Sequence, residues 1–176
     1  MNKIIFIIGA SGSGKTTLVK KLEKEESAHF RVLYFDSIQV PSFEEMQERY
    51  GGPEEWQRVK TIEWVEEIKK NWLPIQSVVL DGQTRPSFIE EACQKNEISE
   101  FEIILLDCSD DERKRRLIDR GDNNLADVHM MRWAEYLRKE CQNRGYCIID
   151  TTHLTIKEVL SELSEFLHEV IDPSVR

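Results

Sequence analysis

A glycine-rich segment that follows an apolar run constrains this chain more than any other feature. The run Ile4–Ile8 precedes the letters GASGSGKTT, which contain the pattern G-x-x-x-x-G-K-[ST] with Lys15 and Thr16 at its end. Glycines let successive backbone N–H groups turn toward a phosphate, and a following helix presents the positive end of its dipole to the same anion. The lysine supplies a mobile charge for the β- and γ-phosphates, and the threonine hydroxyl can bind Mg²⁺. The segment therefore predicts a nucleotide phosphate site. The residues expected to hold the nucleotide here are Gly9, Ala10, Ser11, Gly12, Ser13, Gly14, Lys15, Thr16 and Thr17.

Length and charge limit the remaining function classes. The chain has 176 residues, which fits a single domain over 1–176. Its 33 acidic and 24 basic residues give a formal net charge of −9, so a general basic surface for nucleic acid or anionic membrane is not expected. The longest apolar runs fall far short of the ~20 residues that span a bilayer. The four cysteines form no CxxC pair, which favours reduced thiols and a cytoplasmic protein.

Short apolar runs alternate with amphipathic segments along the whole chain, which is typical of α/β folds with a parallel sheet. The predicted strands are 3–8, 31–36, 77–81, 101–107 and 146–149. The predicted helices are 15–26, 42–50, 54–72, 87–96, 110–119, 127–144 and 156–170. Four of these helices are expected to open with the capping-box pattern S/T-x-x-E, at Ser42, Ser87, Ser109 and Thr155.

An acidic residue closes the third predicted strand. Asp81 follows the run Val78–Leu80, and an acid at this place can hold a water on Mg²⁺. The alternative is a simple turn at the end of the strand, because Asp-Gly is good turn chemistry.

The segment LDGQTRP is similar to the LDGFPR segment of adenylate kinases. Through it the chain resembles the nucleoside-monophosphate-kinase-like branch of P-loop kinases, which includes adenylate, shikimate and gluconate kinases. The resemblance implies a three-layer fold with a parallel sheet of order 2-3-1-4-5. It also implies that Asp81 lies on the Mg²⁺ side and that Arg85, with Gln83 beside it, contacts the acceptor. Gln83 and Thr84 stand where the family has Phe-Pro.

Two further segments extend this resemblance to the arginines. SDDERKRRLIDRGD looks like the helix that leads into the family's lid, which implies a short lid over 119–128 and places Arg120 near ATP. RWAEY resembles the R-x-x-x-Y segment after the lid, so Arg132 is a second candidate for contacting the transferred phosphoryl group. The alternative for Arg132 is a surface ion pair with Glu135 or Asp127. Arg113, Lys114 and Arg115 are interpreted as a mostly solvated helix face.

The last strand, loop and helix resemble the same branch in GYCIIDTTHLTIKEV. There the loop backbone packs against adenine, which implies that this loop forms one edge of the nucleotide site, with Asp150, Thr151, Thr152, His153 and Leu154. His153 is interpreted as a loop histidine and not as a catalytic base.

Two residues point to different acceptors. Asp36 follows the run Val32–Phe35, where an acid in such kinases often orients or deprotonates a hydroxyl group; a phosphate acceptor is already an anion and needs no base. The alternative for Asp36 is a cap at the end of the strand. Arg85 favours a phosphate or carboxylate acceptor, because a guanidinium group binds such anions with two parallel hydrogen bonds. Residues 37–76 are expected to form a helical insert that sets the specificity.

The combined interpretation is an ATP-dependent phosphotransferase that uses Mg²⁺ and acts on a small molecule, as a monomer or homodimer. A hydroxyl acceptor is slightly favoured; the alternatives are a nucleoside monophosphate kinase and a non-catalytic ATP-binding module. A regulatory GTPase is disfavoured, because neither N-K-x-D nor a D-x-x-G after the third strand occurs. An oligomeric AAA-type ATPase is disfavoured because the short chain leaves no room for a helical lid domain.

Overall fold

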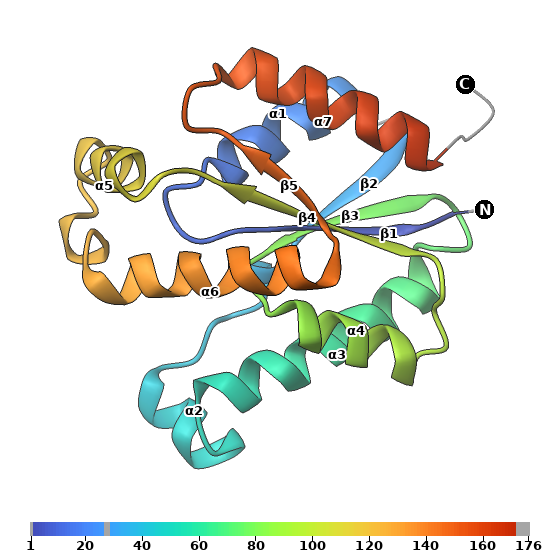
Figure 1. The fold of residues 1–176 in the computed structure, drawn as a ribbon. Helices are drawn as coiled ribbons and strands as arrows, with labels where there is room; N and C mark the ends of the chain where they lie inside the picture. Colours follow the sequence, from blue (N-terminus) through green and yellow to red (C-terminus); the bar gives the residue numbers. More distant parts are fainter. Residues whose placement is uncertain (1, 27–28, 172–176) are drawn as a thin grey trace.

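A parallel five-stranded sheet forms the centre of the computed structural model, which describes residues 2–26 and 29–171 (Figure 1). The ends of the predicted 1–176 domain, at residue 1 and at 172–176, lie outside the described residues. The strand order is β2-β3-β1-β4-β5 and every pairing is parallel, which confirms the predicted order and class. The strands are β1 (Ile4–Ile8), β2 (Phe30–Tyr34), β3 (Ser77–Gly82), β4 (Phe101–Asp107) and β5 (Cys147–Asp150).

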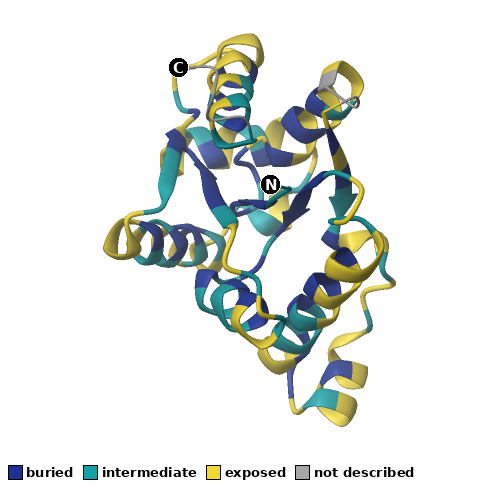
Figure 2. Ribbon diagram, turned by 90° about the vertical axis from the view of Figure 1, so that its right-hand side faces the viewer, coloured by how far each residue is buried: buried dark blue, intermediate teal, exposed yellow. Residues whose placement is uncertain are grey.

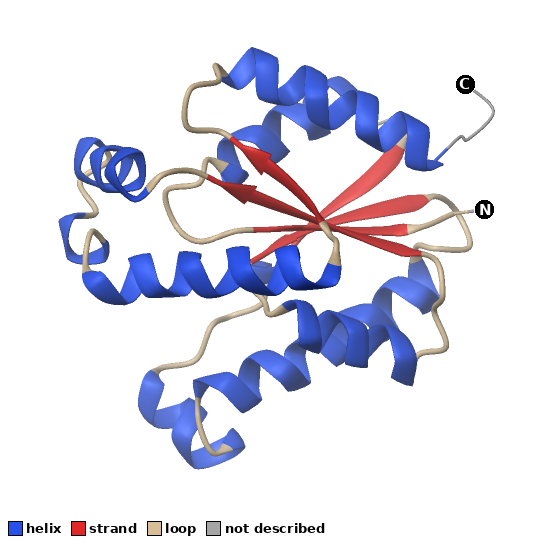
Figure 3. Cartoon of the chain, viewed as in Figure 1, coloured by secondary structure: helices blue, strands red, loops and turns tan. Residues whose placement is uncertain are grey.

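Helices cover both faces of this sheet (Figure 3). One face packs against α1 (Lys15–Glu26) and α7 (Ile156–Ile171), and the other against α3 (Pro53–Asn71), α4 (Pro86–Lys95) and α6 (Val128–Arg144). Figure 2 shows the buried residues on the strands and on the sides of the helices that face them. All five residues of β1 are buried, because helices lie on both sides and alternate side chains enter opposite cores.

The remaining helices lie at the margin of this core. Helix α2 (Phe43–Tyr50) precedes α3 in the predicted insert, and α5 (Asp110–Asp119) lies beyond the carboxyl end of β4 (Figure 1). None of the helices within residues 2–26 and 29–171 combines the length and the apolar composition that a bilayer crossing requires.

Three of the predicted helix starts are made as expected. Ser42 and Glu45 form the complete capping box, in which each side chain satisfies the other's backbone N–H. The hydroxyl of Ser109 accepts the backbone N–H of the residue three positions on, and Thr155 makes the same contact. These side chains satisfy N–H groups that have no partner inside the helix.

The fourth predicted start, at Ser87, is wrong. Helix α4 begins at Pro86, and its N-cap is Arg85, which makes no capping hydrogen bond with its side chain. Proline at the first helical position has its φ angle already set for the helix and no N–H to leave unsatisfied. Glu90 is therefore not used for capping and accepts hydrogen bonds from Arg144 and Tyr146 instead.

The second strand ends earlier than predicted. β2 stops at Tyr34, and Phe35–Ser37 form a short 3₁₀ helix, η1, so Asp36 lies in η1 and not in the strand. The cause is the packing of Phe35 over Gly82, where an added Cβ atom would lie 2.8 Å from the phenylalanine Cβ. A second 3₁₀ helix, η2 (Asn123–Leu125), was also not predicted. All other strand and α-helix boundaries lie within one residue of the prediction.

An ion pair between α3 and α4 makes the insert sensitive to acid. Arg58 donates hydrogen bonds to Glu91 and lowers the pKa of that carboxyl from 4.5 to about 2. A carboxyl with a lowered pKa stabilises the fold above its unfolded pKa and loses that contribution as the pH falls through the folded value. We expect the free energy of unfolding to fall between pH 4.5 and pH 2, and to fall less in Glu91→Gln. Urea titrations at several pH values, with Glu66→Gln on the exposed side of α3 as the control, test this.

Candidate active site

The phosphate loop between β1 and α1 depends on two glycines. Gly9 has φ 156° and Gly12 has φ 84°, in the left-handed region that glycine favours. A Cβ atom on Gly9 would lie 2.4 Å from the carbonyl oxygen of Leu106, and one on Gly12 would lie 3.0 Å from Arg113. The loop thus lies too close to β4 for a side chain at position 9, and a side chain at position 12 would be strained by the positive φ angle and tight against α5. Gly12 falls at a free position of the sequence pattern, so the motif does not single it out.

A buried ion pair lies at the end of this loop. Lys15 Nζ lies 3.8 Å from Asp81 Oδ1, and only 8% of each side chain is exposed. Burial lowers the pKa of Lys15, while the charges of Asp81 and Asp36 partly restore it. Burial likewise raises the pKa of Asp81, and Lys15 opposes that change. Lys15 and Asp81 therefore influence each other, and the charge of Asp36 acts on both.

The site has the donors that a Mg²⁺ ion would use. Asp81 Oδ1 is buried and accepts no hydrogen bond from any described residue. Thr16 lies in the first turn of α1 and is exposed. Within the part of the chain that the structure describes, no three His, Cys, Asp or Glu side chains gather as a ready-made metal site. A carboxylate and a hydroxyl fit Mg²⁺, which keeps several waters and binds through few protein ligands together with substrate phosphates.

A cavity of about 420 Å³ opens beside the phosphate loop, between α5 and the segment that enters α7. This volume falls within the range of small-molecule sites. Its walls include Ser13, Leu18, Arg116, Arg120, Leu154 and Ile156. The structure therefore places Arg120 and Leu154 at the cavity where the sequence expects the nucleotide base.

Thr151 also lines this cavity, as expected, together with Thr155, which the sequence did not predict there. Three other residues expected at this edge do not line it. Thr152 accepts a hydrogen bond from the backbone N–H of Ser109 and donates one to Asp150. Thr152 and Asp150 line a separate hollow on the α6 side, and His153 is exposed.

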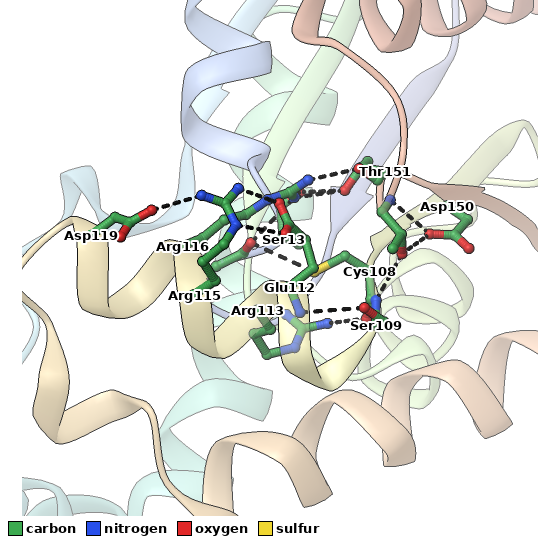
Figure 4. A network of polar contacts seen from close by, with 12 residues as sticks. Ser13, Cys108, Ser109, Glu112, Arg113, Arg115, Arg116, Asp119, Asp150 and Thr151 are labelled. Atoms are coloured by element: carbon green, nitrogen blue, oxygen red, sulfur yellow. Dashed lines mark hydrogen bonds and ion pairs between the residues drawn. The ribbon is translucent and has the colours of Figure 1, made fainter.

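An arginine that sequence reasoning passed over joins the cavity to the phosphate loop (Figure 4). Arg116 donates to the hydroxyl and the carbonyl of Thr151, at 2.8 and 2.7 Å, and to the carbonyl of Ser13 at 3.4 Å. Arg116 Nε donates a hydrogen bond to Glu112 Oε1 at 2.7 Å. Arg120 is exposed and pairs with Asp122. In this structure Arg116, and not Arg120, therefore makes the contact to the loop. Both residues belong to one R-L-x-x-R pattern, which begins at Arg116 and ends at Arg120. This pattern is the signal that could have identified Arg116.

Arg113 is buried, which corrects its interpretation as a solvated residue. Its side chain is 0% exposed and donates to Asp107 Oδ1 at 2.6 Å and to the carbonyl of Ser11 at 2.9 Å. Asp107 also accepts a hydrogen bond from Arg138. A buried guanidinium thus fixes a loop carbonyl on the outer side of the turn. Lys114 and Arg115 are exposed, as expected.

Replacing Arg113 by methionine is expected to lower the free energy of unfolding by about 3 kcal/mol. Removing one member of a buried ion pair costs about 3–5 kcal/mol, and the lower end applies because Arg138 still compensates the charge of Asp107. Urea unfolding at neutral pH measures the change. Arg115→Met on the exposed side of the same helix should stay within about 0.5 kcal/mol of the wild type. Equal values for the two variants would contradict the role given to Arg113.

The loop after β3 contacts the phosphate loop from the side opposite α5. Gln83 donates to the hydroxyl of Ser11 at 2.9 Å, and Gln57 of α3 donates to the carbonyl of Gln83 at 2.6 Å. Arg85 in turn donates to Gln57 Oε1 at 2.8 Å. The structure therefore links Gln83 and Arg85 to the phosphate loop and to the predicted insert.

Arg132 lies on the exposed side of α6, next to a residue that packs against Arg85. Among the described residues, the two acids considered as its ion-pair partners make other contacts. Glu135 pairs with Lys139 at 2.6 Å, and Asp127 caps α6 through the backbone N–H of Met130.

Comparisons with known proteins agree with this geometry. A family model described as "AAA domain" matches residues 5–137, from β1 into α6. The chain belongs to the AAA domain family. The matched part of this AAA domain contains the phosphate loop, Asp81 and the arginines of α5.

Several proteins similar to this chain are kinases. A shikimate kinase of Bacillus cereus (strain AH187) is 28% identical over 95% of this chain and 99% of its own length. A sugar kinase from Janibacter sp. HTCC2649 superimposes with a TM-score of 0.65 at 16% identity, covering 99% of this chain and 98% of its own. A deoxyadenosine kinase from M. mycoides gives a TM-score of 0.62 at 13% identity, covering 94% of this chain and 99% of its own. The resemblance to P-loop kinases is thereby confirmed, and the solved structures share the fold.

Proposed function

We propose that this AAA domain is an ATP-dependent kinase that transfers the γ-phosphoryl group of ATP to a hydroxyl group of a small molecule. The observation that supports it most is the buried Lys15–Asp81 pair at the end of the phosphate loop, with Asp36 close enough to act on both charges. A phosphate-binding lysine, a metal-binding carboxylate and a free acceptor-side carboxylate are what such a transfer needs.

The residues divide the work of this reaction. The backbone N–H groups of the loop and Lys15 bind the β- and γ-phosphates of ATP. The adenine ring of ATP enters the cavity beside Leu154 and Arg116. Asp81 and Thr16 would hold Mg²⁺, which neutralises phosphate charge when bound. We assign Arg120, at the start of the proposed lid over 119–128, and Arg132, in α6 beyond its end, to the transferred group. Because phosphoryl transfer needs little covalent chemistry from the protein, positioning and charge supply most of the rate.

The acceptor is proposed to react through a hydroxyl group. Asp36 is exposed in η1 and is available to accept the proton of an attacking hydroxyl, which is worth about 10²–10⁴-fold in rate. The similar proteins named as kinases of shikimate, a sugar and deoxyadenosine all act on molecules that carry hydroxyl groups. The proposed insert over 37–76 shapes the pocket for the acceptor. Arg85 supports the second candidate, a nucleoside monophosphate kinase, because guanidinium suits phosphate.

An acceptor screen tests the proposed function. ADP formation is measured with Mg²⁺-ATP and a panel of sugars, sugar acids, nucleosides and nucleoside monophosphates. We expect ADP formation that depends on an alcohol acceptor and exceeds ATP hydrolysis in its absence. ATP binding without transfer to any acceptor would favour a non-catalytic module, and transfer only to monophosphates would favour the second candidate.

A further inference from the structure

We propose that Glu54 is a specificity-determining residue that neutralises Arg85, so that the acceptor pocket selects an uncharged polyhydroxy molecule over one that carries a phosphate group. This inference rests on the proposed kinase function and deepens it. In the sequence alone, Arg85 favours a phosphate acceptor. In the fold, the contacts of Arg85 with Glu54 and Gln57 favour an uncharged acceptor instead.

The guanidinium of Arg85 already has two partners from α3. One terminal nitrogen pairs with Glu54 Oε2 at 3.1 Å, and the other donates to Gln57 Oε1 at 2.8 Å. Its central carbon also lies 5.0–5.7 Å from three aromatic ring centres. These rings belong to Phe88, Trp133 and Tyr136. Bidentate phosphate binding needs two adjacent N–H groups, so a phosphate that bound to both terminal nitrogens would compete with Glu54 and Gln57.

Releasing these partners would disturb the phosphate loop. Gln57, which holds Arg85, also donates to the carbonyl of Gln83, whose own side chain donates to Ser11. Three hydrogen bonds therefore run from Arg85 to the loop that binds ATP. A phosphate that displaced Gln57 from Arg85 would remove the first of these bonds. An alcohol could bind beside Arg85 and leave all three hydrogen bonds intact.

Charge gives the second reason. Glu54 is exposed, with 67% of its side chain accessible, against 22% for Arg85. An exposed ion pair is weak by itself, so Glu54 does not lock Arg85; it places a negative charge where an incoming phosphate would lie. Repulsion between that charge and a phosphate dianion about 6 Å away, in water and moderate salt, corresponds to about a three- to tenfold loss of affinity.

The test measures binding and not turnover. The phosphate loop is first saturated with Mg²⁺ and a non-hydrolysable ATP analogue, and adenosine monophosphate and adenosine are then titrated by calorimetry. Glu54→Gln removes the charge and keeps the shape. Glu55→Gln is the matched control, because it removes the same charge from the next residue, which pairs with Arg58 and not with Arg85.

We expect Glu54→Gln to bind adenosine monophosphate about three to ten times more tightly than the wild type, with adenosine unchanged. Glu55→Gln should change the affinity less than twofold, and adding Arg85→Gln to Glu54→Gln should abolish the gain. Equal affinities in the two glutamate variants, a gain that survives without Arg85, or no monophosphate binding by Glu54→Gln would each overturn the proposal. Failure of the kinase proposal would appear separately, as the absence of transfer in the acceptor screen.

Discussion

The Lys15→Ala variant is expected to fold normally and to transfer phosphoryl groups about 10³-fold more slowly than the wild type. Lys15 is the buried cation at the end of the phosphate loop, and losing one preorganised charge-stabilising donor costs about 10²–10³-fold or more in such sites. Single-turnover rates with the acceptor found in the screen measure the effect. The fold should persist because the cores on both sheet faces are apolar and do not include this side chain.

The same variant has an electrostatic consequence. Burial already raises the pKa of Asp81, and Lys15 is the charge that opposes it, so alanine at position 15 should raise the pKa of Asp81 further. Weaker Mg²⁺-dependent nucleotide binding should therefore appear at a higher pH as the solution is acidified. Lys20→Ala on the exposed side of α1 serves as the control. A folded Lys15→Ala protein with wild-type activity would contradict the mechanism.

Asp36→Asn is expected to slow transfer to an alcohol by about 10²–10⁴-fold while leaving ATP binding unchanged. Asparagine keeps the shape of the side chain but cannot take the proton of the attacking hydroxyl. The value of kcat, measured beside ATP affinity from calorimetry, separates chemistry from binding. Ser37→Ala, the exposed neighbour in η1, is the control.

Transfer to a phosphate acceptor provides the contrast. Such an acceptor is already an anion, so Asp36→Asn should change its rate only mildly. An equal loss with both kinds of acceptor would assign Asp36 a structural role, and no loss with an alcohol would remove it from the mechanism.

The sheet and the phosphate loop could be predicted because local patterns determine them. Apolar runs such as Ile4–Ile8 are buried on both faces, and the pattern that ends at Lys15 requires a strand before it and a helix after it. The end of β2 could not be predicted, because it depends on Phe35 packing over Gly82, which lies 47 residues away along the chain (82 − 35 = 47).

The arginines of α5 show the same limit within one helix. Charge alone makes Arg113, Arg115 and Arg116 look alike, yet only Arg115 is exposed. Arg113 and Arg116 share a helix face with the buried Leu117, and that 3.6-residue spacing is the signal that separates them. The pairing of Arg85 with Glu54 had no local signal, because the two residues come from different elements.

Three hydrogen bonds run from Arg85 through Gln57 and Gln83 to Ser11, so they connect the proposed acceptor side with the proposed ATP site. If an acceptor bound beside Arg85 strengthens or weakens these hydrogen bonds, the affinity of the phosphate loop for ATP changes by some factor. Reciprocity then demands the same factor when the order of arrival is reversed. ATP and the proposed acceptor should therefore change each other's binding affinity before any phosphoryl transfer takes place.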